Sequence, residues 1–241
     1  MRTIPREVQD FAKIKNSFKL SEKQKYVLLG TLLGDGSLNR RGIYYRLHIK
    51  HSYKQISLVE HKREIFSNIT NMLIRVFFQK VKDKDYKFCE FVTLTHPEFS
   101  KYRKLFYNSI QENPDLIGDK LNADMSSEGC HKGKNKVISQ KLKQQLNNPL
   151  SLAMWFMDDG CAEYAGVSLN TQCFSLKEVK LLSYILKENF GLDSTIRKNK
   201  NGWIIYIPKN NLSKFTNIVK KYLLPDFLYK LEPYSTRSIT P

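Results

Sequence analysis

The chain has 241 residues, with 40 Lys and Arg against 23 Asp and Glu, which gives a formal net charge of +17. This excess of positive charge repels itself in a compact fold, so it predicts an anionic partner, usually nucleic acid for a basic globular chain. No apolar run approaches the roughly 18 residues of a transmembrane helix or forms a secretory signal, and the four cysteines contain no Cys-x-x-Cys pair. Membrane spans, secretion, zinc ribbons and disulfide frameworks are therefore not predicted.

The first half of the chain is predicted to alternate helices and strands behind a basic N-terminal arm at residues 1–20. A helix begins at its capping residue Ser21 and ends at Gly34 or Gly36, because hydroxyl side chains favour helix starts and glycine favours helix ends. The further elements predicted in this half are a strand at 43–50, a helix at 54–68, strands at 73–81 and 86–95, and a helix from Pro97.

The second half repeats this order after a segment at residues 111–135 that is rich in Gly, Ser and Pro and is predicted to be a linker or insertion. The elements predicted there are an apolar helix at 150–158, a strand at 166–173, a helix at 175–189, strands at 192–199 and 203–208, and a helix at 210–223. An internal duplication with diverged sequence accounts for the repeated order.

Two apolar helices, at residues 28–36 and 152–160, end in the same Asp-Gly pair. A carboxylate is poorly placed at a helix C-terminus, where the helix dipole is already negative, so the repetition indicates a function. If the two helices pack together, Asp35 and Asp159 come close and repel each other unless a cation lies between them. Oxygen ligands of this kind suit magnesium.

The two stretches resemble the paired signature of the LAGLIDADG homing endonucleases, and the second stretch resembles the yeast mitochondrial intron-encoded branch of that family. The resemblance extends over about residues 21–235. It implies an α+β fold of two pseudo-symmetric αββαββα lobes that pack through the paired LAGLIDADG helices. Each lobe is expected to carry a saddle-like antiparallel β-sheet that binds DNA. The lobes are predicted at residues 21–140, with the insertion inside the first, and at 147–241.

The same resemblance implies a catalytic centre. Asp35 and Asp159 are expected to bind Mg²⁺, together with the backbone carbonyls of Gly34 and Asp158. Mn²⁺ is expected to substitute, and Ca²⁺ to bind without supporting cleavage. One basic residue per site is expected near the scissile phosphate: Lys230 for the second site, and for the first site Lys136, with Lys120 as the alternative. The third position of the signature is Gly30 in one helix and Met154 in the other, which predicts an asymmetric helix interface.

DNA sequence is expected to be read by polar side chains on the sheet faces, since Arg pairs well with guanine, and Asn or Gln with adenine. The candidates in the first lobe are Asn39, Arg40, Arg41, Arg46, His48 and Lys50, and those in the second lobe are Ser168, Asn170, Gln172 and Arg197.

The predicted function is that of a monomeric, site-specific intron homing endonuclease. It would recognise a long asymmetric site in double-stranded DNA and cut both strands with a divalent metal to give staggered ends. The alternatives are an RNA maturase that assists group I intron splicing and a non-catalytic DNA-binding protein on the same fold. The bias toward Lys and Asn is typical of an A/T-rich genome, so an organelle, either mitochondrion or chloroplast, is the expected location, and the bacterial cytoplasm is the alternative. No membrane partner is predicted.

Overall fold

The computed structural model describes residues 17–107 and 136–232, and in these residues the chain forms two similar lobes. The arm at 1–16, the insertion at 111–135 with Lys120, and residues 233–241 lie outside the described residues. The first lobe consists of α2 (Glu22–Leu33), β1 (Ser37–Arg41), β2 (Tyr44–Ser52), α3 (Ile56–Ile65), β3 (Arg75–Val81), β4 (Lys84–Val92) and α4 (Pro97–Phe106), with 3₁₀ turns η1 (Tyr53–Gln55) and η2 (Ser67–Ile69).

A short helix, α5 (Leu142–Gln145), precedes the second lobe. The second lobe consists of α6 (Pro149–Asp159), β5 (Gly160–Ala162), β6 (Gly166–Leu169), α7 (Leu176–Phe190), β7 (Thr195–Asn199), β8 (Gly202–Pro208), α8 (Lys209–Val219), and the 3₁₀ turns η4 (Lys220–Tyr222) and η5 (Pro225–Leu231). The predicted boundaries of the two lobes at 140 and 147 stay predictions.

Both lobes carry an antiparallel four-stranded sheet with the same connectivity. The strand orders are β1-β2-β4-β3 and β5-β6-β8-β7, so each sheet is built from two hairpins joined in the same way. The predicted duplication and the predicted α+β class are therefore confirmed. The copies differ in length, because β2 and β4 have 9 residues each whereas β6 has 4 and β8 has 7.

Local sequence explains where the helices begin. Ser21 and Ser175 each form a complete capping box, with Gln24 and Glu178 respectively, so both serine caps predicted from sequence are confirmed. Proline stands at the first turn of α6, where its missing N–H would have no helical partner in any case. None of the described helices is long and apolar enough to cross a membrane.

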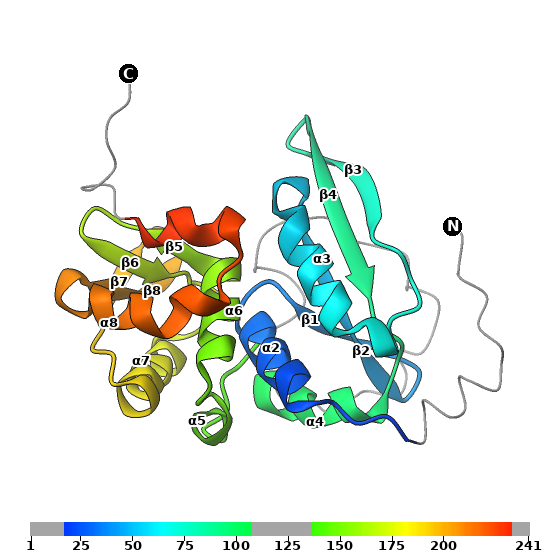
Figure 1. Cartoon of the computed structure of the whole chain (residues 1–241), viewed down its shortest axis with the longest axis horizontal. Coiled ribbons are helices and arrows are strands. Elements are labelled where there is room, and N and C mark those ends of the chain that lie inside the picture. The colour runs from blue at the N-terminus through cyan, green and yellow to red at the C-terminus, as the bar shows by residue number, and fades with distance from the viewer. Residues whose placement is uncertain (1–16, 108–135, 233–241) are drawn as a thin grey trace.

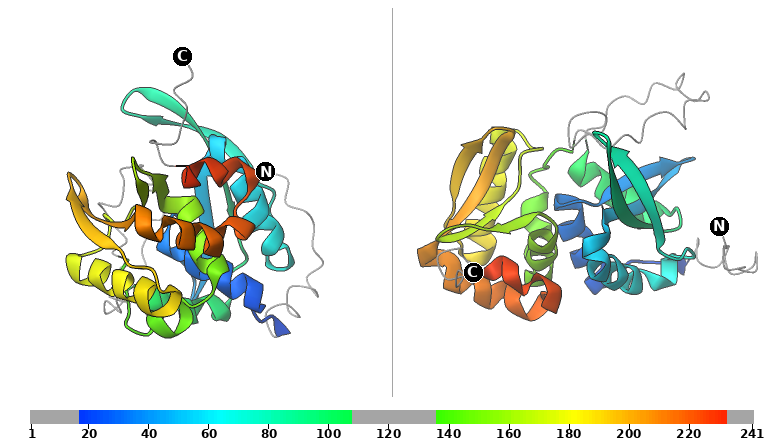
Figure 2. Two further views of the ribbon diagram at one scale, coloured as in Figure 1. Left: turned by 60° about the vertical axis from the view of Figure 1, so that its left-hand side comes forward. Right: turned by 90° about the horizontal axis from the view of Figure 1, so that it is seen from above.

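Helices α2 and α6 stand side by side at the centre of the molecule, and the two sheets lie on opposite sides of this pair (Figures 1 and 2). Eight residues of each helix are buried, including Leu28 and Leu32 of α2 and Trp155 and Phe156 of α6. The helices therefore join the cores of the two lobes into one continuous apolar cluster.

Small residues of α2 allow the close approach of the two helices. A Cβ atom added to Gly30 would lie 2.7 Å from the Cβ of Met154, and one added to Gly34 would lie 2.7 Å from Oδ2 of Asp158. Each glycine of α2 thus faces a larger residue of α6, as the prediction of an asymmetric interface required.

Gly30→Ala is expected to lower the free energy of unfolding by about 3 kcal/mol, because overpacking a tight helix contact forces backbone shifts. Gly42→Ala is the control: Gly42 has a φ of 62° and no atom within 4 Å of an added Cβ, so only the backbone strain of about 1 kcal/mol should appear. Urea unfolding of both variants measures the difference, and equal losses would show that the helix contact is not tight.

Candidate active site and DNA interface

The C-terminal ends of α2 and α6 lie against each other and each presents an aspartate. Asp159 is the last residue of α6, and Asp35 follows α2 after one residue, Gly34. The contact between Gly34 and Asp158 places these ends together. Charge on Lys230 interacts with both Asp35 and Asp159, so one ammonium group lies within reach of both carboxylates. The structure therefore brings together the two aspartates selected from sequence.

Two lysines lie on the carbonyl groups that end these helices, one lysine per lobe. Lys136 donates to the carbonyl of Gly34 at 2.5 Å. Lys230 is buried and donates to the carbonyl of Met157 at 2.6 Å, with the carbonyl of Asp158 at 3.4 Å. Positive groups here stabilise the negative ends of the helix dipoles.

Burial and the neighbouring carboxylates shift the pKa of Lys230 in opposite directions. Burial lowers the pKa of Lys230 from its ordinary value, and Asp158 and Asp159 raise it, with the net effect downward.

Lys136 lies against the first lobe, where it pairs with Tyr107 as an isolated bridge. The structure thus brings Lys136 to the first aspartate.

The side chain of Asp35 is 46% exposed and is oriented by His51, at the end of β2, whose Nδ1 lies 3.3 Å from Oδ2 of Asp35. Burial acts to raise the pKa of Asp35, and the hydrogen bond from His51 acts to lower it. The positive charges of His51, Lys62 and Lys136 lower it further, so the pKa of Asp35 lies below its ordinary value. Asp35 is thereby held as a carboxylate.

A buried ion pair joins the two lobes directly beneath Asp35. Lys62 of α3, in the first lobe, donates to Oδ1 of Asp158, in the second lobe, at 2.5 Å, and neither side chain has any exposed surface. His51 Nε2 lies 3.6 Å from the same oxygen. The ammonium group of Lys62 therefore compensates the buried negative charge of Asp158.

Sequence reasoning missed Lys62 and His51, although a signal for Lys62 was present. In α3 the apolar positions Leu58, Val59 and Ile65 define a core stripe at helical spacing, and Lys62 occupies the next position of that stripe. A lysine on a core stripe predicts a buried partner of opposite charge. His51 had no such signal, because a histidine in an alternating strand is equally compatible with a solvent-exposed face.

The oxygen atoms at the helix ends are suitable ligands for a hard divalent cation. Two carboxylates, of Asp35 and Asp159, and the carbonyls of Gly34 and Asp158 supply oxygen only, which Mg²⁺ and Ca²⁺ prefer. The same carbonyls already attract the ammonium groups of Lys136 and Lys230. In the part of the chain that the structure describes, no three His, Cys, Asp or Glu side chains form a metal cluster by themselves. Further oxygen ligands would have to come from water or from a bound phosphate.

The sheet of the first lobe presents a polar face beside Asp35. The register pairs Asn39 with Arg46 and Lys50 with Glu90 on this face, while Leu47 and Ile49 on the other face enter the core. The side chains form a network, which consists of Asn39 with His48 (3.1 Å), His48 with Glu90 (3.1 Å), Arg75 with Glu90 (3.2 Å) and Lys50 with Gln79 (2.6 Å). The face is thus ordered in the free protein.

Arg46 is the member of this face with an unsatisfied donor. Its Nε atom is buried and has no hydrogen-bond partner among the described residues. Burial lowers the pKa of Arg46, the neighbouring Arg41 lowers it further, and Glu90 partly opposes the shift. The adjacent guanidinium groups of Arg41 and Arg46 would be stabilised by a phosphate or by guanine, because each of these offers hydrogen-bond acceptors.

The second sheet presents a corresponding face beside Asp159. The backbone N–H of Asn170 donates to the carbonyl of Asp159 at 2.9 Å, and Gln172 donates to the side chain of Asn170 at 3.1 Å. Arg197 stacks on the ring of Tyr206 at 3.3 Å, an arrangement that sequence reasoning did not anticipate.

Two of the ten residues predicted to contact DNA do not lie on the accessible polar faces. Ser168 is 1% exposed and donates to Oε1 of Glu163 at 2.7 Å, so the pattern placed it correctly on the strand but did not reveal that neighbours cover it. Arg40 pairs with Tyr45 in the register and so shares the face of Leu38, opposite Asn39. Its guanidinium donates to the carbonyl of Gly42 in the turn.

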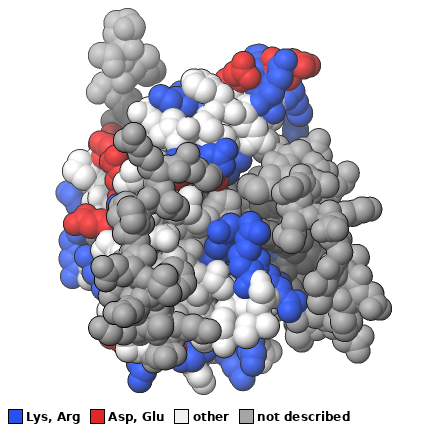
Figure 3. Space-filling view, turned by 90° about the vertical axis from the view of Figure 1, so that its right-hand side faces the viewer, with Lys and Arg blue, Asp and Glu red and all other residues white. Residues whose placement is uncertain are grey.

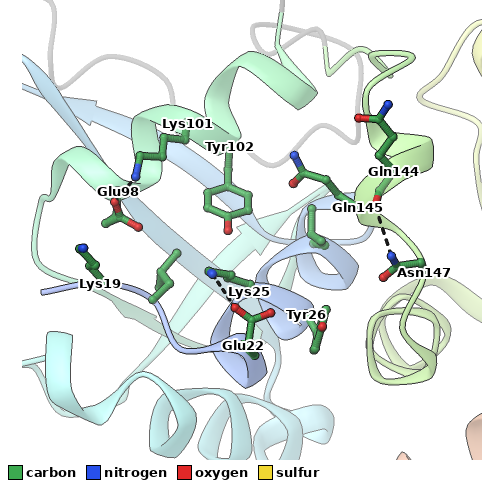
Figure 4. Close-up of a pocket in the computed structure, with 12 residues that line it drawn as sticks. Lys19, Glu22, Lys25, Tyr26, Glu98, Lys101, Tyr102, Gln144, Gln145 and Asn147 are labelled. Carbon is green, nitrogen blue, oxygen red and sulfur yellow. Dashed lines mark hydrogen bonds and ion pairs between the residues drawn. The ribbon is translucent and has the colours of Figure 1, made fainter.

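A cleft of about 590 Å³ lies at the other end of α2 and has no connection with the aspartates. Its lining includes Glu22 and Lys25, which form an ion pair, and Tyr102 of α4 (Figure 4). Glu22 and Leu33 are the first and last of the 12 residues of α2, so they stand about 17 Å apart along the helix axis. Lys and Arg side chains are grouped near the centre and along the lower edge of the face shown in Figure 3.

Comparison with known proteins places this arrangement in one family. The model of the LAGLIDADG DNA endonuclease family matches residues 25–123 and again 124–215. The chain is 32% identical over 218 residues to the cytochrome b mRNA maturase bI2 of Saccharomyces cerevisiae, a match that covers 86% of this chain and 47% of that protein. It is 32% identical to the intron-encoded endonuclease ai4 of Dictyostelium discoideum, covering 67% of this chain and 91% of that protein.

A solved structure shares the fold along nearly the whole chain. The homing endonuclease I-WcaI bound to its DNA recognition sequence superposes with a TM-score of 0.76 at 26% identity, and 92% of each chain is covered. The chain spans about half the length of the yeast maturase that it matches. The fold and the paired helix ends define a single-chain, double-motif protein of the homing endonuclease class.

The chain belongs to the LAGLIDADG DNA endonuclease family, with one copy of the family domain in each of its two matched segments. The resemblance read from the two Asp-Gly helices is therefore confirmed.

Lys62→Met is expected to destabilise the protein by about 3–5 kcal/mol, because it leaves the buried carboxylate of Asp158 without a partner. The double variant Lys62→Leu/Asp158→Ala should recover most of this loss, since no buried charge remains. Urea unfolding of the single and double variants measures both effects. Lys25→Met removes the exposed pair with Glu22 and should change stability very little. A double variant no more stable than Lys62→Met would contradict the ion pair.

Proposed function

We propose that the chain is a site-specific DNA endonuclease that hydrolyses both strands of its target with a divalent metal. The proposal is carried by one observation: two aspartates meet at the ends of paired helices, between two sheets with polar faces. Each aspartate would serve one strand, and the separation of the two cuts would give staggered ends. Double-stranded DNA is the partner, and one chain supplies both lobes.

The protein groups around the reacting phosphate have distinct tasks. A bound Mg²⁺ would polarise the phosphate and orient a water, and Asp35, Asp159 and neighbouring helix-end carbonyls would hold it. Lys136 and Lys230, with their ammonium groups beside the carboxylates, would stabilise the negative charge that builds on the phosphate during attack.

The sheet faces would select the target sequence and contribute affinity. Arg46, His48 and Lys50 in the first lobe, and Asn170, Gln172 and Arg197 in the second, would contact base edges in the major groove, which is wide enough for a two-stranded ribbon. Asn39 and Arg41 would extend the first surface. Because the two faces differ in sequence, the preferred site would be asymmetric. Mn²⁺ should replace Mg²⁺, and Ca²⁺ should support binding without cleavage.

RNA maturase activity is the second candidate, and one observation favours it: the relative at 32% identity and 86% coverage of this chain is named as a cytochrome b mRNA maturase. The endonuclease is preferred because both aspartates are retained at the helix ends. The intron-encoded relatives also support an origin in an organelle, and we propose the mitochondrion.

Asp35→Asn and Asp159→Asn are each expected to slow the cutting of one strand by about 100-fold or more, because losing even an outer partner of a metal ligand costs about 10–100-fold. Each variant should convert a supercoiled plasmid with the intron-less host sequence to nicked circles in Mg²⁺. DNA affinity in a gel-shift assay with Ca²⁺ should stay near that of the wild type. Parallel loss of binding and cutting would contradict a metal role.

Arg41→Gln is expected to weaken DNA binding and to reduce the magnitude of the salt slope of log K by about 0.9, the contribution of one phosphate contact. Lys101→Gln is the control, since Lys101 is an equally exposed cation on α4, paired with Glu98 beside the cleft at the far end of α2. It should leave the slope unchanged. Fluorescence anisotropy at several salt concentrations measures both slopes, and an unchanged Arg41→Gln slope would remove Arg41 from the phosphate contacts.

A further inference from the structure

The buried ion pair beneath Asp35 has no counterpart in the other half of the molecule. The residues that match Asp158, His51 and Lys62 in the duplicated structure are found from the pairing register of the strands and from the N-caps of the helices. Asp158 precedes Asp159 as Gly34 precedes Asp35.

Two further matches complete the comparison. Ser37 and Cys161 occupy matching positions, because each stands two residues after its aspartate. Ser37 pairs with His48 and Cys161 pairs with Ser168, so His48 matches Ser168. His51 and Thr171, each three residues further along the chain, therefore match as well. Lys62 and Leu182 each stand seven residues beyond the N-caps of their helices, Gln55 and Ser175.

The three matching positions, which also come from both lobes, are occupied by residues that carry no charge. Leu182 lies in the apolar core, and the hydroxyl of Thr171 donates to the carbonyl of Trp203 at 2.8 Å. Gly34 has no side chain and makes the room that Asp158 fills. The three charged or ionisable groups, two from the first lobe and one from the second, thus meet near Asp35, and none stands at the matching positions.

His51 lies between one carboxylate from each lobe. Its Nδ1 atom is 3.0 Å from Oε1 of Gln55 and 3.3 Å from Oδ2 of Asp35, so it lies within reach of both oxygens. Its Nε2 atom faces Oδ1 of Asp158 at 3.6 Å. The ring itself is buried and in contact with Asp158, which Lys62 holds in turn, and Nε2 has no hydrogen-bond partner among the described residues.

We propose that His51 and Lys62 are positioning residues for the first active site. Lys62 anchors Asp158 of α6, and His51, held between Asp158 and Asp35, fixes the Asp35 carboxylate relative to the second lobe. The two active sites are consequently unequal, since Asp35 depends on this chain of contacts and Thr171 supplies no equivalent to the second site. The inference rests on the proposed function, because it assigns Asp35 to the cleavage of one strand.

The first experiment follows each strand separately. The target duplex carries a different label on each strand, and single-turnover rates in Mg²⁺ are compared for wild type, His51→Leu and His51→Gln. Asp35→Asn identifies the strand that the first site cuts. His51→Leu should slow that strand by about 10- to 100-fold relative to the other strand, the usual loss when a partner that orients a metal ligand is removed. His51→Gln, which keeps a donor, should recover most of the rate.

Thr171→Val is the matched control, because it changes the corresponding buried position in the other lobe. It should leave the ratio of the two strand rates within about two-fold of wild type, since the hydroxyl of Thr171 donates to the backbone carbonyl of Trp203. An equal slowing of both strands by His51→Leu, or no slowing, would overturn the inference. If His51→Leu does not fold, Lys62→Leu/Asp158→Ala, which removes the anchor without leaving a buried charge, provides the same strand comparison.

A second readout does not depend on cleavage. Mn²⁺ binding to the protein alone is titrated by electron paramagnetic resonance, with Asp35→Asn as the variant that must lose affinity. His51→Leu should weaken the site that Asp35→Asn removes by about 10-fold or more, whereas Thr171→Val should not. If wild type cuts no DNA but this pattern holds, the proposed function fails and the positioning role stands. If His51→Leu binds Mn²⁺ as wild type does, the positioning role fails.

Discussion

The close contact of α2 with α6 forces several negative groups into one small volume, and the rest of the structure depends on compensating them. The ends of two helix dipoles and the carboxylates of Asp35, Asp158 and Asp159 all lie there. Each would repel the others if it were left alone. Lys136 and Lys230 cover the helix-end carbonyls, and Lys62 neutralises the carboxylate that is fully buried. Asp35 is exposed and Asp159 is partly exposed, and we propose that these two carboxylates bind a cation from solution.

Much of this arrangement could be predicted from the sequence because it depends on periodicity and on repetition. The serine caps, the duplicated Asp-Gly ends and most of the helices and strands follow from local patterns, and the structure has them. The first strand of each sheet, β1 and β5, is not predicted from periodicity. The repetition predicts more than either copy does alone, because two similar helices that end in the same pair of residues imply a contact between them. The choice of Lys136 comes from the family resemblance, and the structure brings Lys136 to the carbonyl of Gly34.

The remainder could not be predicted because it depends on which side chain covers which. Ser168 lies on the correct face of its strand, but Glu163 and the packed sheet remove it from the surface. Arg40 is displaced to the opposite face by one residue of register. His51 and Lys62 meet Asp158 across 96 and more residues of sequence, and no local pattern encodes the partner of a buried charge.

The unequal strand lengths of the two sheets have a consequence for the DNA. The two central strands have 9 residues each in the first lobe and 4 and 7 residues in the second, which correspond to about 30 Å against about 14 Å and about 24 Å of strand. With about 3.4 Å per base pair along the duplex, the first lobe would follow the groove for more base pairs than the second. We therefore expect a lopsided footprint that reaches further from the cleavage point on one flank. A symmetric pair of identical subunits has no means of building such an imbalance.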